Sequence, residues 1–231
     1  MERASRDYNV QFNGAIIVTT VTNDSLKVES VLAELRASLS RTPTREFLCY
    51  NSTSTDIDVD RNIGLDVKYK CDSKENSIAT VQLCHGKLCL VIQLPYLDSI
   101  PNTLKRFFEE TTINFVGVGI KQVASQLERD YGLKCANTVE LGYLFAKIRG
   151  RGSDHYSNLE LAELTAEILG VAIVKPQGIV HSDWGARFLT SEQVNYATVN
   201  ASASFACLKK LSTHDEYDYK MTNLLTRGFC Y

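Results

Sequence analysis

Three β-like segments joined by short connections constrain the fold of this chain more than any other feature. They cover residues 62–70, 77–84 and 87–94, are rich in aliphatic and β-branched side chains, and are separated by a polar stretch and by His85-Gly86. Short runs of this composition between turn signals predict a meander of neighbouring strands. Helix-like and strand-like segments alternate after the meander, so the sequence predicts a mixed α/β sheet.

A hairpin and a helix are predicted before the meander. Asn13-Gly14 separates the strand-like residues 8–12 from residues 14–20, and Asn-Gly is a strong signal for a two-residue hairpin turn. Asp24 or Ser25 is the expected N-cap of a helix whose apolar residues recur at helical spacing. That predicted apolar face comprises Leu26, Val28, Val31, Leu32, Leu35 and Leu39.

The second half of the chain is predicted to be mostly helical. Helices are expected at 102–110 after Pro101, at 121–131 before Gly132, and at 138–148, 158–169, 190–211 and 214–226. A short buried strand is expected at 114–119, and loops at 40–61 and 175–187. Gln193 is the expected capping-box partner of Thr190 or Ser191. The sequence has no internal repeat or linker, so residues 1–231 are predicted to form a single domain.

Composition limits the setting and the partners of the protein. No run approaches eighteen apolar residues and the first residues lack an apolar signal segment, so neither a membrane span nor secretion is expected. Seven cysteines without a Cys-x-x-Cys pair argue against a disulfide framework or a zinc site, which favours an intracellular, reducing compartment. The net charge of −2 weakens the expectation of strong nucleic-acid binding but leaves room for a local basic groove.

Three separated segments carry the residues that bear on function. They are Asn62-Ile-Gly-Leu-Asp66-Val-Lys68-Tyr, Phe115–Leu127 with Gly117-Val-Gly-Ile, and Gln193–Phe205 with Tyr196 and Asn200. Their order and spacing resemble the three motifs of the DEDDy 3′–5′ exonucleases, and most closely the Werner-syndrome-like exonuclease domains of the compact, plant type. The resemblance covers about residues 8–212 and suggests a setting in the nucleus or cytoplasm. It implies a ribonuclease-H-like, DnaQ-like fold, in which α-helices flank a mixed β-sheet.

The resemblance also implies a metal site that this chain does not reproduce. The family binds two Mg²⁺ or Mn²⁺ ions with four carboxylates and uses a tyrosine to position the attacking water. The matching positions hold Asp66, Lys68, Val123 and Asn200, with Tyr196 in the tyrosine position. Their summed formal charge is zero, whereas hard divalent cations need anionic oxygen ligands. We therefore expect no bound metal, no cofactor and no hydrolysis.

The sequence thus predicts a catalytically degenerate exonuclease-like protein, a pseudoenzyme that binds single-stranded nucleic acid or another protein. Lys68 and Tyr196 are the candidate nucleic-acid contacts. Residues 66 and 68 share one face of a strand, so the Lys68 side chain can reach Asp66. Two plainer interpretations stay open: Tyr196 as a half-buried helix residue, and Asp66 as a carboxylate held by Lys68 or by a helix N-terminus. The sequence does not decide whether the chain forms a homo-oligomer.

The alternative is a weak or rewired metal-dependent 3′–5′ exonuclease that acts on DNA or RNA ends. Such an enzyme would have to recruit other carboxylates, and the candidates are Glu128, Asp130 and Glu140. Glu140 matches a family position that is acidic but lies outside the metal quartet, so it is a poor substitute.

Overall fold

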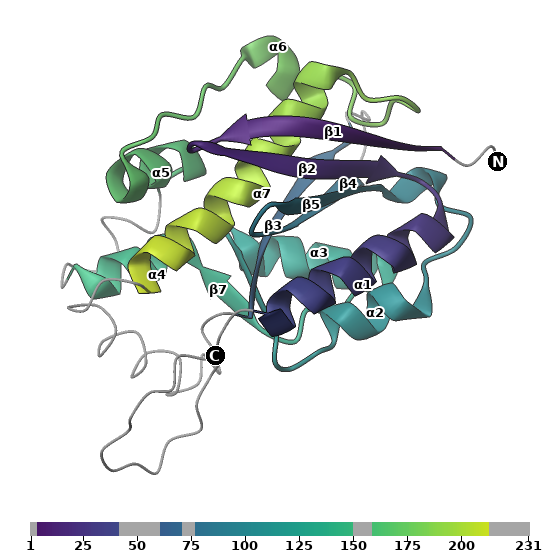
Figure 1. Ribbon diagram of the computed structural model, residues 1–231, viewed down its shortest axis with the longest axis horizontal. Coiled ribbons are helices and arrows are strands. Elements are labelled where there is room, and N and C mark those ends of the chain that lie inside the picture. The colour runs from purple at the N-terminus through teal and green to yellow at the C-terminus, as the bar shows by residue number, and fades with distance from the viewer. Residues whose placement is uncertain (1–3, 42–60, 71–76, 150–158, 213–231) are drawn as a thin grey trace.

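The computed structural model describes residues 4–41, 61–70, 77–149 and 159–212. These residues form one seven-stranded sheet and the helices that cover it (Figure 1). The strands are β1 (Ser5–Phe12), β2 (Ala15–Thr22), β3 (Asn62–Tyr69), β4 (Ile78–His85), β5 (Leu88–Gln93), β6 (Asn114–Gly117) and β7 (Thr138–Glu140). The helices are α1 (Ser25–Arg41), α2 (Asn102–Phe108), α3 (Ile120–Tyr131), α4 (Leu141–Ile148), α5 (Leu161–Leu169), α6 (Gln177–Val180) and α7 (Ser191–Ser212). A 3₁₀ turn, η1 (Leu94–Tyr96), follows β5.

The sheet is mixed, as the sequence predicted. Its strand order is β1-β2-β5-β4-β3-β6-β7. Strands β3, β4 and β5 form an antiparallel meander, and β6 and β7 continue in parallel from β3. These five strands have the ribonuclease-H-like arrangement, and the hairpin of β1 and β2 extends the sheet through a parallel pairing of β2 with β5. The predicted fold class is therefore confirmed.

Local turn and cap signals account for the first two elements. Asn13 and Gly14 adopt φ values of 47° and 73°, the left-handed backbone that a two-residue hairpin turn requires. The Asp24 carboxylate accepts a hydrogen bond from the Leu26 N–H at 3.0 Å and so caps α1. The expected apolar face is buried except for Leu26, which is 63% exposed. Placing Leu26 on that face was wrong, because at about 100° per residue it points roughly 160° away from Val28.

Helices cover both faces of the sheet. Residues of α1, α2 and α3 form one apolar cluster with Ile63, Leu65 and Val67, and α7 packs on the opposite face. Figure 1 shows α7 crossing this second face diagonally. Because side chains alternate along a strand, Asp66 and Lys68 project from β3 towards α7.

Some element boundaries differ from the sequence predictions. Residues 138–148 do not form one helix, because Thr138–Glu140 pairs with β6 as a strand whose three residues are too few to give a recognisable pattern. The predicted loop at 175–187 contains the short helix α6, and α2 begins at residue 102 as predicted, after the N-cap Pro101, but ends at Phe108. The helix expected at 214–226, and residues 42–60 of the predicted polar loop, lie outside the described residues.

The described residues also bear on the predictions from composition. Within these ranges, every helix is too short or too polar to cross a membrane. Cys84, Cys89, Cys135 and Cys207 are free thiols, and the first two face each other across the β4–β5 hairpin.

Candidate functional site

An ion pair stands at the motif positions of β3. The Lys68 ammonium donates to the Asp66 carboxylate, with 2.5 Å between Nζ and Oδ2. Their side chains are only 11% and 24% exposed, so both charges are largely removed from water. Because side chains alternate along β3, the sequence had predicted that Lys68 could reach Asp66. The positive charge of Lys68 thus balances the negative charge of Asp66.

Two aromatic rings close over the Lys68 ammonium. Its Nζ lies 4.7 Å from the centre of the Tyr196 ring and 5.8 Å from the centre of the Trp184 ring. The two ring centres are 6.3 Å apart. An ammonium at these distances is attracted by the negative faces of the rings. We call Asp66, Lys68, Trp184 and Tyr196 the lysine cage.

The loop that supplies Trp184 is held by three hydrogen bonds, one from the indole itself and two from Gln193. The indole N–H of Trp184 donates to the Val180 carbonyl at 3.3 Å. The Gln193 amide donates to the Ser182 hydroxyl at 2.9 Å and to the Asp183 carbonyl at 3.0 Å. The Trp184 ring therefore has a fixed place over the ammonium before any ligand binds.

Helix α7 brings Tyr196 to the cage because β3 has a glycine where the two elements cross. A Cβ at Gly64 would lie 2.0 Å from the Ala201 carbonyl oxygen, a distance that no side chain can occupy. The helix begins with the capping box that the sequence predicted: the Gln193 N–H donates to the Thr190 hydroxyl, and the Thr190 N–H donates to the Gln193 side chain. Close crossing and a fixed start together set the position of Tyr196.

The remaining two motif positions are placed differently. Asn200 is 8% exposed and follows Tyr196 by four residues, so both lie on one face of α7. Val123 lies in the first turn of α3. Gly64 of β3 pairs in parallel with Val116 of β6, so α3, which follows β6, begins near the level of Asp66. Its side chain packs against the apolar cluster on the other face of the sheet. The structure thus brings Lys68 into contact with Asp66 and Tyr196, and Val123 lies in the first turn of α3 with its side chain against the apolar cluster.

The other candidate carboxylates have structural partners. Glu140 accepts hydrogen bonds from the Gly119 N–H at 3.1 Å and the Ile120 N–H at 2.9 Å, so it caps α3. Burial raises the pKa of Glu140, and these two bonds oppose the rise. Asp130 accepts from the Arg129 guanidinium at 2.7 Å and, with Glu128, lies in the last turns of α3.

The donor set at the lysine cage does not fit a divalent metal ion. Of the four motif positions, Asp66 alone carries a carboxylate, and an ammonium is bonded to it. Val123 has no lone pair and Asn200 offers a neutral amide oxygen. Within the described ranges, His, Cys, Asp and Glu side chains nowhere gather in threes at metal-binding distance.

Sequence reasoning identified the ion pair but missed the role of Trp184. The only tryptophan of the chain was assigned to a loop, and loops seldom predict a contact with a distant strand. Burial, and then the charges of Asp66 and Asp130, raise the pKa of the neighbouring Tyr69. No periodicity in the sequence would reveal that Trp184 lies over Lys68.

Comparison with known proteins gives one family. Residues 62–214 match the sequence profile of the 3′–5′ exonuclease family. The chain is 31% identical over 150 residues to human Exonuclease 3′-5′ domain-containing protein 2, a match that covers 62% of this chain and 24% of that protein. It is 29% identical over 154 residues to a 3′–5′ exonuclease of Arabidopsis thaliana, covering 64% and 52%. The chain therefore spans about a quarter to a half of the length of these relatives.

The chain is also similar to two further proteins. The chain is 30% identical over 139 residues to the mouse bifunctional 3′–5′ exonuclease/ATP-dependent helicase WRN, covering 60% of this chain and 10% of that protein. A crystal structure of the EXD2 exonuclease domain superposes with a TM-score of 0.47 at 23% identity, covering 92% of this chain and 99% of that one.

Proposed function

The chain belongs to the 3′–5′ exonuclease family, and we propose that it is a member that binds single-stranded nucleic acid without hydrolysing it. The observation that carries this proposal is the position of the Lys68 ammonium, 2.5 Å from Asp66 and facing the Tyr196 ring. A cation supplied by the chain itself occupies the place where the family arranges its anionic ligands.

Charge supports the loss of hydrolysis. A divalent ion placed about 4 Å from the Lys68 ammonium would meet a repulsion of about 8 kcal/mol at an effective dielectric constant of roughly 20. The single carboxylate that would offset this repulsion, Asp66, is already bonded to that ammonium. Without metal ions, Tyr196 has no metal-bound water to position. We therefore infer no reaction step at this centre.

The same groups favour retention of a strand. An ammonium carries three N–H donors, and the bond to Asp66 uses one of them. The other two suit a phosphate oxygen that approaches the 11% of the side chain that is exposed, beside the Trp184 and Tyr196 rings. Binding of this kind needs no metal, so EDTA should not weaken it.

The rewired-enzyme alternative makes a distinct demand on the structure. It requires carboxylates from α3 or β7, yet Glu140 caps a helix and Asp130 is paired with Arg129. Asp130 also lies about 10 Å along the helix axis from Val123, since seven residues rise 1.5 Å each. If weak Mn²⁺-dependent cleavage were observed and Asp130→Asn abolished it, the alternative would be correct.

The test uses the full chain with end-labelled single strands and duplexes of DNA and RNA. We expect no cleavage ladder with Mg²⁺ or Mn²⁺, and binding of single strands that persists in EDTA. A ladder from the purified wild-type protein, removed by Asp66→Asn, would refute the non-hydrolysing assignment. If no labelled strand binds, the protein-interaction function of this fold takes its place.

A gain-of-function series sharpens the test. Lys68→Glu with Asn200→Asp adds two carboxylates to that of Asp66, which gives three near Tyr196 on the face that α7 covers. Adding Val123→Asp completes the quartet but puts a charge against an apolar cluster, so its thermal stability must be measured in parallel. We expect Mg²⁺-dependent 3′–5′ cleavage to appear in the triple variant. A folded triple variant that shows saturable metal binding and no cleavage would contradict the argument that the carboxylates alone are missing.

A further inference from the structure

The first strand gives the sheet a long outer edge. In the strand order of the sheet, β1 and β7 are the two edge strands. Strand β7 has three residues, whereas β1 pairs with β2 over eight residues without a shift in register. Proteins usually blunt an edge strand by shortness, bulges, prolines or charges. Strand β1, the outermost strand in Figure 1, is neither short nor bulged and contains no proline.

The main-chain groups of alternate residues point outward along this edge. The turn between β1 and β2 has two residues, so Phe12 and Ala15 on either side of it form a hydrogen-bonded pair. Hydrogen-bonded and non-hydrogen-bonded pairs alternate along an antiparallel ladder. The residues whose N–H and C=O groups point outward are therefore Asp7, Asn9 and Gln11. Within the described ranges, no main-chain group bonds to these outward groups.

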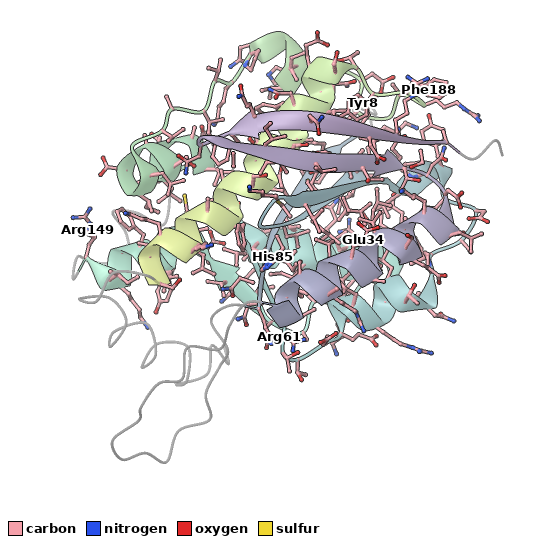
Figure 2. All side chains as sticks on the ribbon, viewed as in Figure 1. Tyr8, Glu34, Arg61, His85, Arg149 and Phe188 are labelled. Atoms are coloured by element: carbon pink, nitrogen blue, oxygen red, sulfur yellow. The ribbon has the colours of Figure 1, made fainter. Side chains whose placement is uncertain are left out.

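The two charged side chains of β1 are engaged within the chain. The Asp7 carboxylate accepts a hydrogen bond from the Thr20 hydroxyl at 2.6 Å. The Arg6 guanidinium carbon lies 5.8 Å from the centre of the Phe188 ring, and Figure 2 shows Phe188 at the end of the molecule where β1 begins. Asn9, in the middle of the outward residues, is exposed and uncharged. The edge is thus left without a charge at its centre that would repel another strand.

We propose that two copies of this chain pair through β1, antiparallel about a twofold axis at Asn9, so that their sheets become continuous. In this register the Asn9 residues of the two copies face each other, and Asp7 of each copy faces Gln11 of the other. Each hydrogen-bonded pair exchanges two main-chain bonds, so these pairs supply about six. On the opposite face, Tyr8 of each copy lies across from Val10 of the other, and such aromatic–β-branched pairs stabilise sheets.

Charge favours this register over its neighbours. Centring the pairing on Asp7 would put two carboxylates directly opposite each other, which destabilises a sheet. Centring it on Tyr8 would put the Asp7 side chains on a diagonal, about 7–8 Å apart. With the centre at Asn9, the two Asp7 side chains are separated by four residues along the strands, or about 13 Å. Moving the centre further, to Val10, leaves fewer hydrogen-bonded pairs.

The pairing does not depend on the proposed function. The lysine cage belongs to β3, which lies four strands from β1 in the sheet, a separation of about 19 Å. A dimer formed through β1 therefore leaves both cages outside the interface.

Sedimentation velocity of the full chain at 1 to 100 µM tests the pairing. We expect the mass to shift with concentration from the 25.8 kDa of one chain towards twice that value. Asn9→Pro should raise the dissociation constant at least about tenfold, because proline removes an outward N–H and its ring projects from the edge. The melting temperature of this variant should change little, since that N–H has no main-chain partner within one described chain.

Charge variants that keep every main-chain donor test the register. Asn9→Lys puts two ammonium groups opposite each other, so it should raise the dissociation constant, and 0.5 M NaCl should reduce that effect. Gln11→Lys puts an ammonium opposite Asp7 of the other copy and should lower the dissociation constant. Ser30→Lys adds the same charge at an exposed position of α1, so this matched control should dimerise like the wild type.

A wild-type chain that keeps the mass of one copy throughout this range would overturn the pairing and leave the proposed function intact. A dimer that Asn9→Pro and Asn9→Lys both leave unchanged would have its interface elsewhere, which would overturn the pairing as well. If Asn9→Lys strengthened the dimer, the register centred on Asn9 would be refuted, because the new ammonium would then face Asp7.

Discussion

Removing either charge of the lysine cage should destabilise the fold, and removing both should cost less than the sum. At 2.5 Å and an effective dielectric constant of roughly 20, the gross attraction between Lys68 and Asp66 is about 7 kcal/mol. Desolvation offsets much of it, and measured losses run from about 0–1 kcal/mol for exposed pairs to about 3–5 kcal/mol when a buried pair is broken. With side chains 11% and 24% exposed, the pair lies between these limits.

We expect Asp66→Asn to lower the free energy of unfolding by about 2 kcal/mol, because it leaves a mostly buried ammonium with only its aromatic neighbours. Lys68→Met should cost about 1–2 kcal/mol, since Asp66 is the more exposed partner and methionine packs well against aromatic rings. The double variant should cost about 1–2 kcal/mol in total, which corresponds to a coupling energy of about 2 kcal/mol.

Urea unfolding at pH 7, followed by tryptophan fluorescence, measures this coupling directly. The single tryptophan of the chain is Trp184, whose ring centre lies 5.8 Å from Lys68 Nζ, so its emission reports on the cage itself. The control cycle uses Arg129 and Asp130, because the Arg129 side chain is 71% exposed and its coupling should fall below about 0.5 kcal/mol. Additive losses at Asp66 and Lys68 would refute the view that a partly buried ion pair holds this site together.

Three further predictions concern groups around the site and the core. Gly64→Ala should cost about 3 kcal/mol or more in urea unfolding, because its Cβ would meet the Ala201 carbonyl at 2.0 Å, whereas Gly178→Ala, with open space around it, should stay within about 0.5 kcal/mol. The raised pKa of Glu140 means that the folded state holds its proton more tightly than the unfolded state. The free energy of unfolding should therefore fall as the pH rises from 4.5 through the raised pKa, and Glu140→Gln should flatten that slope; an unchanged slope would contradict the assignment. Burial raises the pKa of the Cys135 and Cys207 thiols to about 12, so N-ethylmaleimide at pH 8 should label both at least about 100-fold more slowly in the native protein than in urea, as peptide mass mapping would show.

The sequence predicted those elements whose cause is local. Asn13-Gly14 determines a hairpin turn, Asp24 and Thr190 cap helices, and the apolar stripe of α1 follows the helical period, so these features were confirmed. The three-residue strand β7 was missed because its stability comes from pairing with β6, and no property of Thr138–Glu140 alone distinguishes it from the first turn of a helix.

The residues of the candidate site show the same difference between local and long-range causes. The pairing of Asp66 with Lys68 follows from the two-residue period of a strand and was available from the sequence. The place of Trp184 over Lys68 depends on hydrogen bonds from Gln193 to the loop that carries the indole, which the sequence does not specify.

The balance of charge between Lys68 and Asp66 changes which groups must supply the free energy of ligand binding. Four carboxylates without metal repel one another, by about 4 kcal/mol for each pair 4 Å apart at an effective dielectric constant of roughly 20, so such a centre needs its cations. The Lys68–Asp66 pair removes that need, but one ammonium offers far less positive charge to a phosphate than two divalent ions would. Under the proposed function, a bound single strand must therefore gain most of its affinity from contacts outside the centre.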